Sequence, residues 1–119
     1  MPGKIVHFEL PSANVGRAVG FWSGLFGWSF GESMSPEFEY RMVQVSDDQG
    51  GAVMPSEDGG SAPTVYFDTD DIEASIAKVR ELGGEAGDKM PVPTHGWFAA
   101  CKDTEGNSFS LWQGDASAA

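Results

Sequence analysis

The first segment of the chain carries the residues best suited to acid–base or ligand chemistry. His7 and Glu9 lie two positions apart in the alternating stretch Ile5–Leu10, so both side chains share one face of a predicted strand. Imidazole titrates near physiological pH, and it serves as a general base, a catalytic role assigned here to His7, or as a donor that anchors a ligand. A carboxylate beside it orients the ring or pairs with a bound cation. The alternatives are a hydrogen-bonded interior histidine and a partly solvated carboxylate.

Later strands offer further polar and aromatic groups. Thr64 and Tyr66 share one face of a second predicted strand, and Ser110 and Trp112 share one face of the last strand. Together with Met54, these side chains are expected to line a mixed pocket that suits an aromatic or amphipathic small molecule. The alternative is that Tyr66 and Trp112 simply pack in the core.

The segment Met90–Trp97 contains two prolines and leads into a strand, which predicts a loop that acts as a lid. His95 and Trp97 are then expected to meet the ligand at the mouth of the pocket. The alternative for a loop histidine is a solvated side chain. Cys101 is the only cysteine, so no internal disulfide forms, and a buried, unreactive thiol is expected.

The chemistry-bearing residues are positioned by two similar sets of elements. In the first half, Asn14 is a plausible cap for a helix over 15–26 that ends at Gly27. Asp70 and Asp71 precede the second helix, over 72–82, which Gly83 and Gly84 close. The predicted strands are Ile5–Leu10, Trp28–Gly31, Phe38–Val45, Gly51–Met54, Thr64–Asp68, Glu85–Lys89, Trp97–Lys102 and Ser108–Gln113.

The two halves repeat one pattern. Val15 and Ile72 lie 57 positions apart, and so do Gly27 and Gly84. The turn residues Asp47 and Asp103 lie 56 positions apart. Each half therefore reads as a β-α-β-β-β module that cannot bury both faces of its sheet alone. We expect one α+β domain over 1–119, with modules at about 4–54 and 64–113 and a linker over 55–63.

Composition limits the function classes. The chain of 119 residues has eighteen acidic and seven basic residues, so its net charge is −11. This charge opposes binding to nucleic acid or to anionic membrane surfaces. No apolar run approaches the ~18 residues of a membrane span, and the N-terminus lacks the pattern of a signal peptide. These features favour a cytoplasmic protein.

At this point the ordered motifs resemble a known superfamily. The segments 7–10, 17–22 and 25–28 are similar to the opening of the vicinal oxygen chelate superfamily, which contains glyoxalase I, bleomycin-resistance proteins and extradiol dioxygenases. The segments 70–72, 82–84 and 103–107 look like its second module. The resemblance covers roughly residues 4–113 and implies curled mixed sheets that enclose a cavity.

The resemblance also implies where a metal would bind. Metal-dependent members hold one divalent ion on up to four side chains, and the matching positions here are His7, Met54, Thr64 and Ser110. Only the histidine is a strong ligand, because a thioether and two neutral hydroxyls are weak donors for Mg²⁺, Mn²⁺, Fe²⁺ or Ni²⁺. No metal residues and no cofactor are therefore expected.

Three hypotheses about function remain open. The first is a metal-free binding protein of the bleomycin-resistance kind, whose acidic cavity favours a polar aromatic or cationic ligand. The second is a glyoxalase-like or dioxygenase-like lyase or isomerase that uses His7 as a base or as part of an atypical metal site, completed by Glu9 or His95. The third is an interaction module with a degenerate cavity. A homodimer is expected, with Trp22, Phe30, Phe38 or Trp112 supplying apolar contact.

Overall fold

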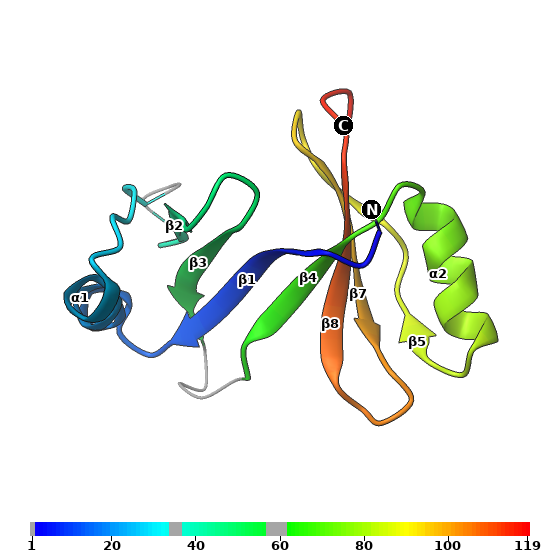
Figure 1. Cartoon of the computed structure of the whole chain (residues 1–119), viewed down its shortest axis with the longest axis horizontal. Coiled ribbons are helices and arrows are strands. Elements are labelled where there is room, and N and C mark those ends of the chain that lie inside the picture. The colour runs from blue at the N-terminus through cyan, green and yellow to red at the C-terminus, as the bar shows by residue number, and fades with distance from the viewer. Residues whose placement is uncertain (1, 34–36, 57–61) are drawn as a thin grey trace. The chain divides into compact units, whose positions relative to one another are not determined.

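The computed structural model describes residues 2–33, 37–56 and 62–119. The chain forms two compact units, one over Val6–Thr64 and one over Val65–Ala119 together with the N-terminal residues up to Ile5. Each unit combines one helix with a small mixed sheet (Figure 1). The α+β class predicted from the sequence is confirmed.

The first unit builds its sheet in the order β2-β3-β1. Its elements are β1 (Ile5–Ser12), α1 (Val15–Phe26), β2 (Arg41–Gln44) and β3 (Gly50–Pro55). β1 and β3 run parallel, with His7 opposite Gly50 and Glu9 opposite Ala52, while β2 and β3 run antiparallel. The chain between β1 and β3 includes α1, the crossover that a parallel pair requires.

The second unit has the sheet order β4-β8-β7-β5, and β6 pairs with β7 outside that path. Its elements are β4 (Thr64–Asp68), α2 (Ile72–Glu81), β5 (Glu85–Ala86), β6 (Met90–Val92), β7 (Gly96–Lys102) and β8 (Ser108–Gly114). α2 lies beside β5, β7 and β8, as Figure 1 shows. Its buried core is a cluster of Ile72, Ile76, Ala99, Cys101 and Leu111.

The equivalence of the two halves is visible in their pairing and in their helix ends. The parallel pair β1–β3 in one unit corresponds to the parallel pair β4–β8 in the other. Asn14 accepts a hydrogen bond from the Arg17 amide, and Asp71 accepts one from the Ala74 amide, so each helix has the cap that the sequence predicted. Gly27 ends α1 in the left-handed conformation, at φ 72°.

Several predicted bounds were wrong. Helix α2 ends at Glu81, one residue before its predicted end, and Gly83, one of the two glycines predicted to close it, is left-handed at φ 96°. The segment Trp28–Gly31 is no strand, because only Phe30 forms a bridge, to Val43, while the Trp28 ring packs against Phe8 and Trp22. Aromatic packing here replaces a strand ladder.

Three other predicted elements differ in extent. The strand predicted over Phe38–Val45 is reduced to β2, and the one over Glu85–Lys89 is reduced to β5. The supposed loop Met90–Trp97 holds β6, which forms a hairpin with β7, and Pro91 is tolerated there because β6 pairs on one side only. Pro55 belongs to β3 rather than to the predicted linker, and residues 57–61 of that linker lie outside the described residues.

Alternation along β1 separates two environments. The Phe8 ring packs against Trp28 on one face, with ring centroids 5.8 Å apart and ring planes at 36°. A Cβ atom on Gly51, the residue opposite Phe8, would lie 2.2 Å from that ring, so glycine is required there. His7 and Glu9 point to the other face, which leaves them available to Tyr40. Within the described residues, no helix is both long and apolar enough to cross a membrane.

Candidate functional site

Tyr40 joins the two candidate residues of β1 into a hydrogen-bonded triad. Its hydroxyl oxygen lies 2.7 Å from Nε2 of His7, and it donates a hydrogen bond of 2.7 Å to Oε2 of Glu9. All three side chains are partly buried. The imidazole and phenol rings are also stacked, with centroids 6.4 Å apart and planes at 19°. We call His7, Tyr40 and Glu9 the β1 triad.

The order of donors in the triad fixes the tautomer of the histidine. A phenol has one hydrogen, and Tyr40 gives it to the carboxylate of Glu9. The short contact to His7 must therefore be donated by Nε2–H. In the neutral ring, Nδ1 is then the basic nitrogen.

Small residues of the neighbouring strand lie opposite two members of the triad. Gly50 and Ala52 of β3 lie opposite His7 and Glu9, and both are buried. Tyr40 comes immediately before β2, on the far side of β3, and its side chain reaches the face of β1. A Cβ atom on Gly50 would lie 2.9 Å from the carbonyl oxygen of Val43 in β2, so this position is closed to a larger residue.

The environment of the triad favours a neutral imidazole. Burial lowers the pKa of His7 from its ordinary value, and the carboxylate of Glu9 opposes part of that shift. Because the pKa is lower in the folded chain than in the unfolded one, the unfolded state binds more protons as the pH falls. His7 therefore contributes stability that is complete above its unfolded pKa and is lost as the pH falls below it.

We expect the lowered pKa of His7 to make the stability of the folded chain sensitive to acid. Between about pH 7.5 and about pH 5.5, the free energy of unfolding of the wild type should fall more steeply than that of His7→Gln, whose amide does not titrate. Urea unfolding at a series of pH values measures both slopes. Equal slopes for the two proteins would show that His7 is not buried as a neutral ring.

The other predicted residues of the first unit lie near strand ends. Met54 is the penultimate residue of β3 and lies opposite Pro11, and it is half-buried. Thr64 is the first residue of β4, where the first unit ends, and it is also half-buried. Among the contacts of the described residues, the hydrogen bonds of the triad do not include either side chain.

In the second unit, three of the predicted residues share one face of the sheet. Tyr66 of β4 lies opposite Ser110 of β8, and Ser110 is 4% exposed. Trp112 lies two residues further along β8, opposite Phe98, and its ring packs closely against Gly96. The Tyr66 and Phe98 rings are 6.5 Å apart. This face thus carries a phenol, a hydroxyl and an indole.

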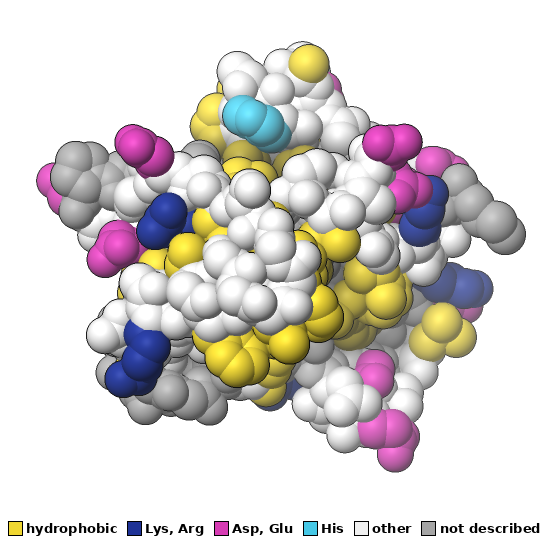
Figure 2. All heavy atoms as spheres, turned by 60° about the vertical axis from the view of Figure 1, so that its left-hand side comes forward, with side chains coloured by type: hydrophobic (Ala, Val, Ile, Leu, Met, Phe, Trp, Pro, Cys, Tyr) yellow, Lys and Arg dark blue, Asp and Glu magenta, His cyan; other side chains and the backbone are white. Residues whose placement is uncertain are grey.

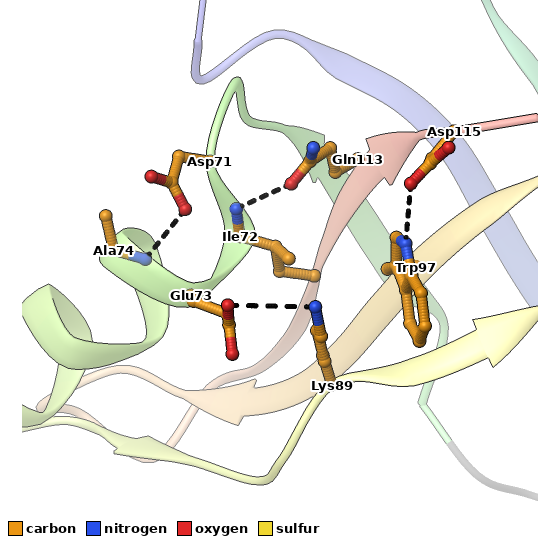
Figure 3. A network of polar contacts seen from close by, with 8 residues as sticks. All are labelled: Asp71, Ile72, Glu73, Ala74, Lys89, Trp97, Gln113 and Asp115. Carbon is orange, nitrogen blue, oxygen red and sulfur yellow. Dashed lines mark hydrogen bonds and ion pairs between the residues drawn. The ribbon is translucent and has the colours of Figure 1, made fainter. Parts of the chain in front are cut away.

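Trp97 lies on the opposite face, toward α2. Its indole N–H and its ring face both make contacts within the second unit (Figure 3). Its indole N–H donates to Oδ2 of Asp115 at 3.0 Å. The ammonium of Lys89, which also pairs with Glu73, lies 4.3 Å from the centre of the Trp97 ring. Hydrogen bonds from Ser117 and from this indole lower the pKa of Asp115.

His95 and Cys101 occupy quite different surroundings. His95 is exposed, and its Nδ1–H donates to the carbonyl of Pro93 at 2.9 Å. Thr94 beside it has φ 65°, a left-handed conformation that is costly for a β-branched residue. Cys101 is 5% exposed in the core cluster, and burial raises the pKa of its thiol, as expected of an unreactive cysteine.

The residues at the metal positions of the superfamily do not fit a divalent ion. Only His7 offers a donor that such ions prefer, because a thioether and two neutral hydroxyls stand at the other three positions. The imidazole nitrogen Nε2 is already bonded to Tyr40. Among the residues that the structure describes, no three His, Cys, Asp or Glu side chains gather in a metal-binding group.

Tyr40 is the residue of the site that sequence reasoning missed. It stood inside a predicted strand as one of several alternating residues and was given no role. The available signal was that Phe38 and Tyr40, two positions apart, share one face of that strand. Their rings stack at 5.7 Å in the structure.

Solved structures of other proteins share the fold of this chain. A methylmalonyl-CoA epimerase from Mycobacterium tuberculosis aligns with a TM-score of 0.73 at 12% identity over 95% of this chain and 88% of its own. A glyoxalase/bleomycin resistance protein/dioxygenase superfamily member from Vibrio splendidus 12B01 aligns with a TM-score of 0.71 at 15% identity over 93% of this chain and 98% of its own. At these identities the likeness concerns the fold.

Sequence comparison is more specific. The model of the glyoxalase-like domain matches residues 6–112, so the chain belongs to the glyoxalase-like domain family, and the resemblance seen in the sequence is confirmed. A glyoxylase-like domain-containing protein of Didymella fabae is 29% identical over 118 residues, which is 92% of each chain. The anthracycline biosynthesis protein DnrV of Streptomyces peucetius is 30% identical over 94% of this chain. The chain spans 47% of the length of DnrV.

Proposed function

We propose that this chain binds a small organic molecule without a metal ion, and that the β1 triad is its polar recognition group. The main observation in support is that the Tyr40 hydroxyl forms a 2.7 Å hydrogen bond with each of His7 and Glu9. A triad held in this way presents an oriented imidazole and a carboxylate without an ion to organise them. The ligand is a polar aromatic or cationic molecule, in keeping with the acidic chain.

Ligand binding is tested by thermal unfolding of EDTA-treated protein. The probes are an aromatic amine, an aromatic alcohol and an anthracycline, the last because one relative is named for anthracycline biosynthesis. A probe at about 100 times its Kd should stabilise the wild type by roughly 2.7 kcal/mol. Tyr40→Phe should weaken binding about tenfold or more, because it removes hydrogen bonds to a carboxylate and an imidazole.

The matched comparison is Tyr66→Phe, which removes the only other phenol hydroxyl of the chain, on a sheet face of the second unit. Loss of binding in Tyr66→Phe alone would move the ligand to that face and overturn the role of the triad. Stabilisation by Mn²⁺, Fe²⁺, Ni²⁺ or Zn²⁺ that disappears in His7→Gln would overturn the metal-free proposal. No stabilisation by any probe would favour the interaction-module hypothesis.

A second candidate function is a lyase or isomerase in which His7 removes a proton from the ligand. The lowered pKa of the buried imidazole supports it, since a base must be unprotonated at working pH. In this role Tyr40 and Glu9 are positioning residues that hold the ring through Nε2. Solvent deuterium incorporation into a bound probe, present in the wild type and absent in His7→Gln, separates this function from simple binding.

We also propose that the chain forms a homodimer through α1. Phe21, Leu25 and Phe26 are 56–61% exposed, and Arg17 is the only charged residue of the helix. Hydrophobic side chains gather on the face drawn in Figure 2. In a chain of net charge −11, such a surface lets two copies meet without like-charge repulsion. Sedimentation velocity of the wild type and of Phe21→Ser tests this, and a monomeric wild type would contradict it.

A further inference from the structure

The carboxylate of Glu9 is poorly neutralised for a half-buried acid. Its one hydrogen bond within the described residues comes from Tyr40, to Oε2. The ion pairs of the described residues join Lys78 to Glu81, Arg80 to Asp88 and Lys89 to Glu73, and none of them includes Glu9. A carboxylate in this state gains from a cation that replaces lost hydration.

Two rings stack on Tyr40, whose hydroxyl donates to this carboxylate. Phe38 stacks on Tyr40 with ring planes at 23°, and His7 stacks on Tyr40 with planes at 19°. Phe38 remains 43% exposed, so part of the stack can be reached from solvent. The electron-rich faces of phenol and phenyl rings attract cations and also pack against flat apolar groups.

The charge of the surrounding unit has the sign that draws cations. Residues 6–64 contain eight Asp and Glu side chains and two Arg. The guanidinium of Arg41 is turned to the carbonyl of Gly31, to which its Nε–H donates at 2.8 Å. Arg17 lies in the first turn of α1. The summed field of this unit therefore raises the local concentration of positively charged molecules.

We propose that Glu9 anchors the protonated amine of an aromatic organic cation, whose flat body packs on the Phe38–Tyr40 stack. The ammonium donates to the carboxylate that Tyr40 orients, and the neighbouring rings stabilise its charge. An inorganic divalent ion lacks the apolar body that this stack accepts, and among the described residues no three His, Cys, Asp or Glu side chains gather to hold such an ion. This inference rests on the proposed binding function and specifies the chemical class of its ligand.

Two probes of similar shape distinguish the effect of the ligand's charge from the effect of its aromatic ring. Benzylammonium and benzyl alcohol are titrated into uniformly ¹⁵N-labelled protein, and amide shifts of β1 and of residues 38–41 are followed. In the wild type, benzylammonium should bind about tenfold more tightly than benzyl alcohol, the effect of one charge-assisted hydrogen bond. Glu9→Gln retains an oxygen that accepts from Tyr40, so the triad geometry survives while the charge is lost.

The expected result is that Glu9→Gln brings the two affinities together, mainly by weakening benzylammonium. Glu39→Gln removes an exposed acid next to Tyr40 in sequence and should keep the wild-type preference. An unchanged preference in Glu9→Gln, or equal binding of both probes to the wild type, overturns the cation site while small-molecule binding stands. Absence of shifts with either probe in the wild type overturns binding at the triad as well.

Discussion

Replacing Gly51 with alanine is expected to destabilise the chain by about 1–3 kcal/mol, the usual cost of overpacking. The new Cβ atom would lie 2.2–2.5 Å from three carbons of the Phe8 ring. The ring would have to leave its place against Trp28, and β1 would shift with it. Since His7 and Glu9 flank Phe8 on that strand, the triad would lose its geometry too.

Thermal unfolding measures this effect, at roughly 4 °C for each kcal/mol in a chain of this size. The matched control is Gly20→Ala in α1, where a Cβ atom would meet nothing within 4 Å. Alanine there should raise stability by roughly 0.5–1 kcal/mol because glycine is a poor helix former. If Gly51→Ala melts like the wild type, Phe8 does not cover β3 as described.

Ile72→Ala is expected to cost about 2–5 kcal/mol, because it opens a cavity in the core of the second unit. Ile72 is 1% exposed and lies among Ile76, Ala99 and Leu111. Its backbone N–H, at the start of α2, also donates to Oε1 of Gln113 at 2.8 Å (Figure 3). The substitution keeps this hydrogen bond, so the loss isolates the packing of the side chain.

Urea unfolding of Ile72→Ala is compared with that of Leu82→Ala at the other end of the same helix. Leu82 is 66% exposed, so its truncation should change the free energy of unfolding by less than about 0.5 kcal/mol. Similar midpoints for the two variants would contradict the assignment of Ile72 to the core.

The elements that the sequence predicted well are those encoded locally. Asn14 and Asp71 cap their helices as expected, because a cap is defined by one side chain and the two or three amides after it. The duplication was readable because the same local signals recur at a fixed spacing. The confirmed family followed from the order of these signals.

The elements that the sequence predicted poorly depend on distant partners. Trp28–Gly31 has the composition of a strand, yet its rings pack with Phe8 and Trp22 instead of forming a ladder. β6 exists because β7 offers it an edge, although two prolines favoured a loop. In both cases tertiary contacts decide against local preference.

The site divides in the same way. The shared face of His7 and Glu9 follows from alternation along one strand. The contribution of Tyr40 does not follow from alternation along one strand. It depends on which residue of a distant segment reaches β1 once β2 and β3 are paired. The only local signal at Tyr40 is that it shares a strand face with Phe38, and this signal does not identify its distant partners.

The triad joins residues 31 and 33 positions apart across a parallel crossover. Forming such non-local contacts carries a loop-closure cost that must be met before the contacts repay it. We therefore expect the triad, which is the proposed recognition group, to form late in folding, after β1 has paired with β3. A ligand that binds the triad binds only chains in which β1 and β3 are already paired. A bound ligand should therefore slow unfolding more than it speeds folding.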